Sequence, residues 1–423
     1  MDKLVIEGPS RLEGEVEAGG AKNAALPLLF ACLLTDQPCR LTNVPDVADI
    51  RTTLRLLESL GASVERPSPN EIVVQCAGIE GFEAPYDLVR RMRASFLTLG
   101  PLLARFGRAH VSRPGGCAIG SRPVDIHLEG MKALGAHLKI EGGYADASAK
   151  RLKGGHVIFA MPSVGATENV LMAASLASGS TRIENAAREP EIVDLADALV
   201  KMGAHIRGAG SSVIEVEGVE KLGGMTHAVI PDRIVAGTFL IGAAMTRGDV
   251  YVRGARADHL ESLLEALVRS GSKVDIDTRG VRVRSTLRPR PVDIITAPFP
   301  GFPTDLQAQW MALLAVADGR SEVHERIFEN RFMHVEELAR MGAQIQLLHG
   351  GHAVVTGVEK LSGAPVMATD LRASVCLVLA GLAAEGRTEV LRIYHLDRGY
   401  EHIDEKLAQL GASVRREAME GQE

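Results

Sequence analysis

The chain has 423 residues, of which 46% are hydrophobic and only 4% are aromatic, and its formal net charge at pH 7 is -6. This length excludes a single small module and predicts two or three compact domains with cores of Ala, Val, Leu and Ile. Acidic and basic residues are interspersed, which excludes the broad positive field that binds nucleic acid. An anionic ligand would therefore have to be met by local arginines.

Neither a secretion signal nor a membrane span is predicted. The N-terminal residues reach charged and turn residues before an apolar run of signal length develops. The longest apolar stretch, from Ala24 to Leu34, is shorter than the roughly 20 residues that cross a bilayer. The cysteines are odd in number and widely spaced, without a C-x-x-C pair or clear metal-ligand spacing, which predicts reduced thiols and a cytoplasmic protein. They are Cys32, Cys39, Cys76, Cys117 and Cys376.

One phrase recurs along the whole chain: an amphipathic helical run ends in Gly and a small residue, and a short alternating strand follows. Successive glycines of this phrase are 74, 68, 68, 71 and 69 residues apart. Gly at this place favours a left-handed helix C-cap, and the alternation is typical of a half-exposed strand. Unrelated caps are the alternative, but the spacing favours internal repeats of about 70 residues, arranged as two globular halves of three repeats each. The glycines are Gly61, Gly135, Gly203, Gly271, Gly342 and Gly411.

The first candidate segment in chain order, residues 19–27, is a turn of small residues that leads into an apolar helix ending near Leu34. Lys22 and Asn23 are predicted near the start of that helix, where free N–H groups and the helix dipole favour an anion. The Gly-Lys-Ser/Thr ending of a Walker A loop is missing. An ordinary surface lysine near a helix start is an equally good interpretation.

Further along, residues 114–123 place Cys117 among glycines, which is typical of a mobile surface loop. Arg113 and Arg122 are close in sequence and could make the thiol reactive, or suit it to act as an acid near neutral pH. A passive loop cysteine explains the local sequence equally well. The other cysteines lie in apolar helices or a strand and are predicted to be structural.

Charged residues at unusual turns mark three later segments, 187–191, 303–307 and 329–334. Asp305 is expected first as a helix cap, with a base at a helix start as the alternative. Arg331 and Arg398 stand at corresponding places of successive repeats, just before the next helix. Arginines in equivalent positions could converge on one multiply charged ligand.

Taken together, these segments resemble the UDP-N-acetylglucosamine enolpyruvyl transferases of the EPSP synthase-like superfamily, almost from end to end. The resemblance implies an α/β fold of two similar domains, each with three βαβαββ units, helices inside and sheets outside, as an inside-out α/β barrel. It implies one domain of residues 21–229, whose cysteine loop at about 113–123 is a lid, and a second of residues 1–20 and 230–423. The matching segments are 20–27, 92–95, 114–127, 188–191, 231–234, 303–305, 329–334, 369–374 and 397–400.

The resemblance also implies the reaction: the enolpyruvyl group of phosphoenolpyruvate passes to the 3-hydroxyl of UDP-N-acetylglucosamine by addition and elimination, with release of phosphate. This is the first committed step of peptidoglycan precursor synthesis.

Cys117 is the implied general acid at C3, able also to form a covalent adduct, and Asp305 is the implied base for the hydroxyl. No cofactor or metal is expected, and the partners are the two substrates, without nucleic acid or membrane. The residues that match phosphate contacts are Lys22, Arg122 and Arg398. Those that match residues near the carboxylate are Arg331 and Arg372. The nucleotide-sugar matches are Asn23, Arg93, Arg122, Pro123, Val124, Asp125, Ile126, Ser163, Val164, Gly165, Asp305 and Ile327.

One position departs from the family pattern, because Met161 stands where some members have a lysine that would contact the diphosphate. Two other functions are compatible with the fold. The shikimate-pathway enolpyruvyl transferase has a different N-terminal motif and no cysteine lid, so Cys117 and the Lys22 segment argue against it. A catalytically silent paralogue that binds a UDP-sugar is disfavoured because Cys117, Lys22, Asp305 and Arg398 are all present.

Overall fold

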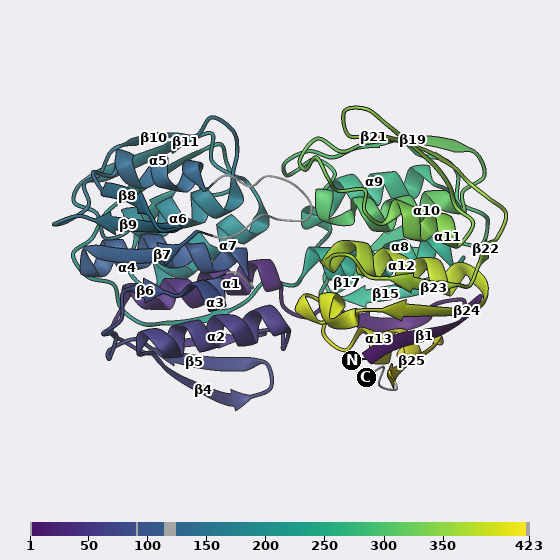
Figure 1. The fold of residues 1–423 in the computed structure, drawn as a ribbon, viewed down its shortest axis with the longest axis horizontal. Coiled ribbons are helices and arrows are strands. Elements are labelled where there is room, and N and C mark those ends of the chain that lie inside the picture. Colours follow the sequence, from purple (N-terminus) through teal and green to yellow (C-terminus); the bar gives the residue numbers. More distant parts are fainter. Residues whose placement is uncertain (1, 90–91, 114–123, 420–423) are drawn as a thin grey trace. The chain divides into compact units, whose positions relative to one another are not determined.

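The computed structural model describes residues 2–89, 92–113 and 124–419 (Figure 1). These residues form two compact units, each with its own apolar core. The N-terminal unit contains the described residues between 20 and 230. The C-terminal unit contains residues 2–19 and 231–419.

The N-terminal unit has three central helices, which are largely buried, and three sheets of four strands. The sheet orders are β14-β3-β5-β4, β6-β7-β9-β8 and β10-β11-β13-β12, and only the first pair of each sheet is parallel. The central helices are α1 (Lys22–Ala31), α4 (Leu99–Phe106) and α6 (Val164–Ala174). The other helical segments are η1 (Cys32–Leu34), α2 (Ala48–Leu60), α3 (Tyr86–Val89), η2 (Arg93–Thr98), α5 (Asp125–Ala133) and α7 (Pro190–Lys201). The strands are β3 (Cys39–Thr42), β4 (Ser63–Ser68), β5 (Glu71–Gln75), β6 (Glu83–Ala84), β7 (Arg108–Ser112), β8 (His137–Glu141), β9 (Tyr144–Ser148), β10 (His156–Ile158), β11 (Ser180–Glu184), β12 (His205–Arg207), β13 (Val213–Glu217) and β14 (Met225–Ala228).

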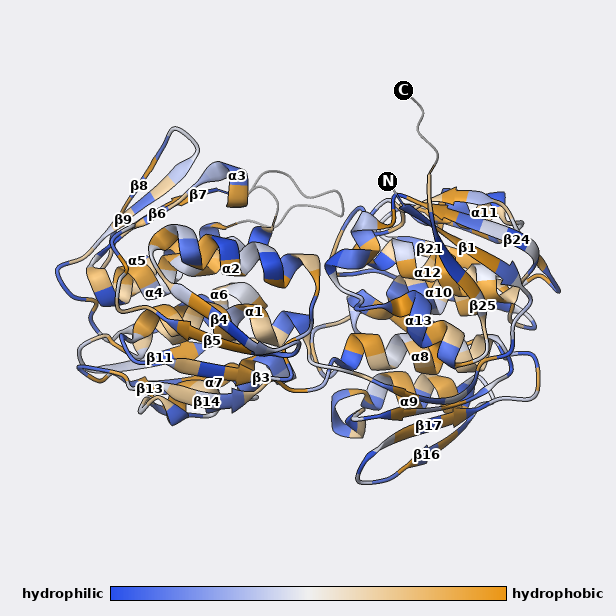
Figure 2. Cartoon of the chain, turned by 90° about the horizontal axis from the view of Figure 1, so that it is seen from below, coloured by the Kyte–Doolittle hydropathy of each residue, from blue (hydrophilic) through white to orange (hydrophobic). Residues whose placement is uncertain are grey.

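The C-terminal unit repeats this plan around α8 (Arg233–Met245), α10 (Gln307–Ala315) and α12 (Leu371–Ala383). In Figure 2 the central helix α8 is largely apolar, whereas the outer helix α13 carries many polar residues. The sheet orders are β16-β17-β15-β2, β18-β19-β21-β20 and β22-β24-β1-β25, with β23 also pairing with β24. The other helical segments are η3 (Ala257–His259), α9 (Glu261–Arg269), η4 (Thr304–Leu306), α11 (Val335–Arg340), η5 (Ile393–Arg398) and α13 (Ile403–Gln409). The strands are β1 (Asp2–Gly8), β2 (Glu13–Glu17), β15 (Asp249–Arg253), β16 (Lys273–Ile276), β17 (Gly280–Arg284), β18 (Ile294–Ile295), β19 (Arg320–His324), β20 (Gln344–Leu348), β21 (His352–Thr356), β22 (Leu361–Ser362), β23 (Pro365–Met367), β24 (Ala384–Leu391) and β25 (Ser413–Ala418).

Each sheet and its helices form one βαβαββ unit, so the predicted fold class is confirmed. In the clearest case the chain runs β10, α6, β11, α7, β12, β13. Three units borrow a strand from elsewhere in the chain. β2 joins the sheet of β15, β1 joins that of β24 and β25, and β14 completes the sheet of β3.

The recurring glycines end α2, α5, α7, α9, α11 and α13, and the predicted left-handed caps are confirmed at all of them. Their φ angles lie between 86° and 107°. The N–H of the next residue donates to a carbonyl five residues back, as from Ala62 to Leu57 and from Ala204 to Leu199. This is the hydrogen bond of a Schellman motif. A strand begins two residues after each glycine.

Replacing one of these glycines tests the cap separately from packing. Gly203 has a φ of 105° and open space where a Cβ would stand, so Gly203→Ala should cost only the left-handed backbone penalty, about 1–2 kcal/mol of unfolding free energy. Gly203→Asn should cost less, because Asn adopts this conformation more readily. Urea unfolding of the three proteins measures the difference. Equal stability of the Ala variant and the parent would contradict the cap.

The four described cysteines are buried. Cys76 lies just after β5 rather than within a helix or strand, so its predicted place is slightly wrong. Among the residues with a described structure, no helix has the length and apolarity needed to span a membrane.

Candidate functional site

The Asp305 carboxylate in the C-terminal unit is held by two arginines, Arg331 from the same repeat and Arg372 from the next. Nη2 of Arg331 donates to Oδ1 at 2.8 Å, and Arg372 donates to Oδ2 from Nη2 at 3.0 Å and from Nε at 3.2 Å. Both arginine side chains are only 4% exposed, whereas that of Asp305 is 27% exposed. The carboxylate is therefore an accessible anion fixed by two nearly buried cations.

The expectation that Asp305 caps a helix is wrong. It lies inside η4, and neither η4 nor the following helix α10 has a side-chain cap. By contrast, Asp232 and Asp370 cap α8 and α12 with hydrogen bonds to backbone N–H groups. The guanidinium groups carry a full positive charge, which backbone N–H groups lack, and they engage both oxygens of Asp305.

Arg372 is the second residue of α12, and one nitrogen of its guanidinium group has no hydrogen-bond partner within the described residues. Burial is the largest single influence and disfavours its charge, but Asp305, Tyr400 and Asp232 together raise the pKa of Arg372 above its ordinary value. The guanidinium carbon lies 5.5 Å from the centre of the Tyr400 ring. Its buried Nη1 makes no hydrogen bond within the described structure. An anion that reached this nitrogen would satisfy it.

A buried glutamate, Glu325, organises the residues beside Asp305. Its Oε2 accepts from the hydroxyl of Thr304 at 2.9 Å, and its Oε1 accepts from the backbone N–H of Ile327 at 2.8 Å. Arg331 in turn donates to the Thr304 hydroxyl at 3.3 Å. Glu325 therefore connects the predicted site residues Asp305, Ile327 and Arg331, and sequence reasoning missed it because its partners lie on separate segments.

Arg398 ends η5 and is half-buried. Burial and then the charge of Arg398 lower the pKa of His395, and Asp370 partly opposes this. The structure thus places Arg398 near His395 and the start of α12 in the same unit.

In the N-terminal unit, Lys22 is the first residue of α1, as predicted, but it is not an ordinary surface lysine. Its Nζ lies 3.2 Å from Oδ2 of Asp49 on α2, and both side chains are nearly buried. Asn23 is the next residue and is half-buried. Asp49 was missed because no local pattern distinguishes it from other acidic residues in the first turn of a helix.

Three groups of predicted residues in the same unit lie around His127. Arg93 begins η2, residues 124–126 begin α5, and Ser163–Gly165 begin α6 with Ser163 as its N-cap. A Cβ on Gly165 would lie 3.1 Å from Cε1 of His127, so a larger residue there would require the His127 ring to shift slightly. Burial and then the charge of Arg93 lower the pKa of His127 to about 4.

His127 is consequently neutral at pH 7, with Nδ1 3.1 Å from the amide nitrogen of Asn169. The ring also meets Phe96 edge-on at 5.3 Å. Sequence reasoning included His127 in a matching segment but gave it no role. Cys117, Arg122 and Pro123 lie outside the described residues.

Glu168 on α6 is a second buried acid near the helix starts. Burial, and then the carboxylates of Glu191 and Glu189, raise its pKa well above the ordinary value. An acid whose pKa is raised on folding favours the folded state below the unfolded pKa, and this stability is lost as the pH rises through the folded pKa. Glu168→Gln should therefore match the parent near pH 4.5 and be more stable by roughly 1–3 kcal/mol at pH 8.

Urea unfolding at both pH values measures this difference. The control is Glu265→Gln on α9, because Glu265 is exposed and should change stability little at either pH. A Glu168→Gln protein that is less stable than the parent at pH 8 would mean that the ionised carboxylate is stabilised in the fold.

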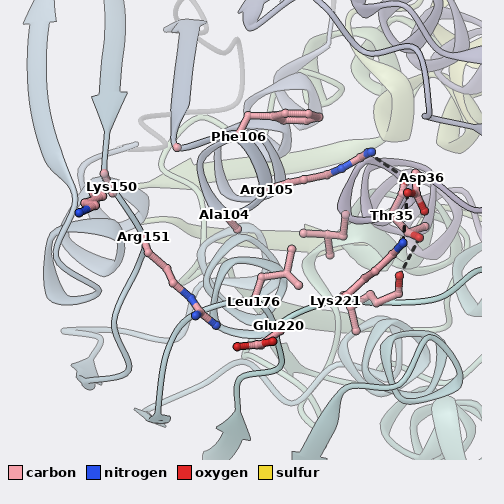
Figure 3. Close-up of a pocket in the computed structure, with 14 residues that line it drawn as sticks. Thr35, Asp36, Ala104, Arg105, Phe106, Lys150, Arg151, Leu176, Glu220 and Lys221 are labelled. Atoms are coloured by element: carbon pink, nitrogen blue, oxygen red, sulfur yellow. Dashed lines mark hydrogen bonds and ion pairs between the residues drawn. The ribbon is translucent and has the colours of Figure 1, made fainter.

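A cavity of about 870 Å³ lies at the other ends of the central helices of the N-terminal unit, after η1 and α4 (Figure 3). Nη1 of Arg105 on α4 donates to the carbonyls of Leu33 and Thr35 at the end of η1 and to that of Cys76 just after β5. Lys221 pairs with Asp36 at 3.2 Å. None of the predicted site residues that the structure describes lines this cavity, so it is separate from the candidate site.

Comparison with known proteins gives a consistent result along the whole chain. The family model of EPSP synthase (3-phosphoshikimate 1-carboxyvinyltransferase) matches residues 6–407. A UDP-N-acetylglucosamine 1-carboxyvinyltransferase of Trichlorobacter lovleyi is 56% identical over 98% of this chain and 99% of its own. UDP-N-acetylglucosamine 1-carboxyvinyltransferase 2 of Carboxydothermus hydrogenoformans is 57% identical with the same coverage.

Solved structures agree with this assignment. The enolpyruvyl transferase NikO of Streptomyces tendae is 27% identical, with a TM-score of 0.88 over 98% of this chain and 99% of that one. EPSP synthase of Acinetobacter baumannii, at 18% identity and a TM-score of 0.76 over 99% of this chain and 100% of that one, shares the fold. The chain therefore belongs to the EPSP synthase family and, within it, to the family of the UDP-N-acetylglucosamine 1-carboxyvinyltransferases.

Proposed function

We propose that the protein transfers the enolpyruvyl group of phosphoenolpyruvate to the 3-hydroxyl of UDP-N-acetylglucosamine and releases phosphate. The names of its full-length relatives support this substrate pair. The structural observation that carries the proposal is the Asp305 carboxylate, fixed between Arg331 and Arg372 and still partly exposed. We also propose that the protein acts in the cytoplasm, in the synthesis of peptidoglycan precursors.

The reaction needs three proton transfers, the formation of one C–O bond and the cleavage of another. The sugar hydroxyl loses a proton as its oxygen bonds to C2 of phosphoenolpyruvate, and C3 gains a proton. The tetrahedral adduct then loses a proton from C3 and expels phosphate, which restores the double bond. We assign the first proton to Asp305 as base and the proton that C3 gains to Cys117 as general acid. No phosphoryl group passes to an acceptor.

The arginine pair has a function in both binding and catalysis. A substrate carboxylate is an anion of the same kind as Asp305, so it can bind the same donors, beginning with the unpartnered Nη1 of Arg372. Sharing the guanidinium groups in this way would loosen their hold on Asp305 and free an oxygen for the hydroxyl proton. Lys22, Arg122 and Arg398 are assigned to the phosphate.

The nucleotide sugar is assigned to the residues around His127 and to neighbouring family matches. The neutral imidazole places no extra positive charge beside Arg93 at pH 7, so its role is to position the starts of α5 and α6. Met161 is exposed, and its uncharged side chain cannot form an ion pair with the diphosphate. The assigned residues are Asn23, Arg93, Arg122, Pro123, Val124, Asp125, Ile126, Ser163, Val164, Gly165, Asp305 and Ile327.

Phosphate release measured with combinations of substrates tests the proposal. We expect release only when phosphoenolpyruvate and UDP-N-acetylglucosamine are both present. Phosphate release with phosphoenolpyruvate and shikimate 3-phosphate would mean that the acceptor is shikimate 3-phosphate, the substrate of the other family branch, and not the sugar nucleotide. No release with either acceptor would indicate a binding protein without activity.

A further inference from the structure

Two histidines and a glutamate meet on the outer face of the sheet that contains β19 and β21. These two strands lie at the top of the C-terminal unit in Figure 1. Glu322 and His324 are two residues apart on β19, so their side chains share one face. His352 on β21 is paired directly with His324 in the antiparallel register. Two regular strands therefore hold all three side chains in place.

The donor atoms of the cluster are close enough to share one ligand. One donor atom from each residue lies within 4.8 Å of the other two. Oε2 of Glu322 is 3.3 Å from Nε2 of His352 and 3.6 Å from Nε2 of His324. The imidazole rings are stacked, with centroids 4.1 Å apart and planes at 15°. The side chains of His352, His324 and Glu322 are 22%, 34% and 47% exposed.

The hydrogen bonding of this cluster is incomplete. Nε2 of His352 is shielded from solvent and makes no hydrogen bond in the described part of the chain, although the Glu322 carboxylate is near it. The short distance without a hydrogen bond means that the two groups are not aligned for one. Within the described residues, the ion-pair partners of Glu322 are these two histidines alone. A cation bound between this buried ring nitrogen, in its unprotonated form, and the carboxylate would satisfy both groups.

We propose that Glu322, His324 and His352 bind one divalent transition-metal ion of the Zn²⁺ or Ni²⁺ class. Imidazole nitrogen with carboxylate oxygen suits these ions, whereas Mg²⁺ and Ca²⁺ prefer oxygen ligands alone. The stacked rings must splay so that both Nε2 atoms reach the ion at about 2.0–2.1 Å. Exposure of Glu322 leaves a fourth position for water.

The proposed ion takes no part in enolpyruvyl transfer, because the cluster shares no residue with the arginine pair. It would clamp the end of β19 to β21. His324 directly precedes Glu325, whose carboxylate holds Thr304 beside Asp305. An ion that binds only the folded protein also raises its stability through linkage.

Isothermal titration of the EDTA-treated full chain with Ni²⁺ tests the site. We expect one ion per chain in the parent and an affinity at least about tenfold lower in His324→Gln and in His352→Gln. The matched control is His110→Gln on β7. His110 also stands on an outer sheet face, stacked on Tyr144 at 4.4 Å and 3.7 Å from Asp146, but supplies a single imidazole. The control variant should bind Ni²⁺ like the parent.

Co²⁺ supplies a second readout, because nitrogen and oxygen ligands give visible d–d bands without the intense near-ultraviolet band of a thiolate ligand. Thermal unfolding in EDTA shows whether each variant is folded. Unchanged affinity in both β19–β21 variants, a thiolate band, or no binding up to about 1 mM ion would overturn the proposal.

Discussion

Asp305→Asn should lower kcat about 10²–10⁴-fold, the usual contribution of a positioned base. The amide keeps the size of the carboxylate but cannot accept the hydroxyl proton. It also presents N–H donors where Arg331 and Arg372 both need an acceptor. Steady-state phosphate release with both substrates measures kcat and KM.

The same change should lower stability, since two nearly buried guanidinium groups lose their shared anion. Breaking a buried ion pair costs about 3–5 kcal/mol. Asp305 is 27% exposed, and water screens part of this interaction, so we expect about 1–3 kcal/mol. Urea unfolding separates this loss from catalysis, and activity is compared at a temperature where both proteins are folded.

Asp318→Asn is the matched control, because Asp318 lies just beyond the other end of α10 and pairs with Arg288 while largely exposed. It should change kcat and stability little. An Asp305→Asn enzyme with the kcat of the parent would exclude Asp305 as the base. A residue that neighbours Asp305 would then have to be the base.

Features decided by neighbouring residues could be predicted from the sequence. The left-handed caps could be predicted at the recurring glycines because such a cap depends only on where a helix ends and the chain turns. Gly61 and Gly411 both adopt this conformation. Lys22 at the start of α1 followed from the change from small residues to an apolar run. The family resemblance added the use of β1 and β2 by the C-terminal unit, which local patterns do not contain.

Features decided by distant partners were missed or only partly predicted. Asp305 was expected as a cap because caps are common at that position, but its oxygens are engaged by arginines 26 and 67 residues away. Glu325 and Asp49 have no distinctive local sequence, and their importance comes from the partners that packing brings to them. The low pKa of His127 likewise depends on burial, which no spacing of residues in the sequence reveals.

Cys117→Ser should abolish most turnover near neutral pH, by about 10²–10⁴-fold, and should abolish thiol labelling by an epoxide phosphonate such as fosfomycin. A hydroxyl is a far weaker acid than a thiol, so it cannot protonate C3 at a useful rate, and it is a poorer nucleophile towards the epoxide. Mass spectrometry of the labelled protein and phosphate release measure the two effects. Loss of both together would assign proton donation and adduct formation to one sulfur.

The described cysteines make this test selective, because Cys32, Cys39, Cys76 and Cys376 are all buried. Burial raises the pKa of Cys76 to about 12, with a smaller contribution from Cys39, so that thiol stays protonated and unreactive at pH 7. Cys76→Ala is therefore the control that should keep both the label and the activity. If the Cys117→Ser protein were still labelled, a buried thiol would have to become accessible. If it kept full turnover without a label, the thiol would be a site of inhibition and the acid would lie elsewhere.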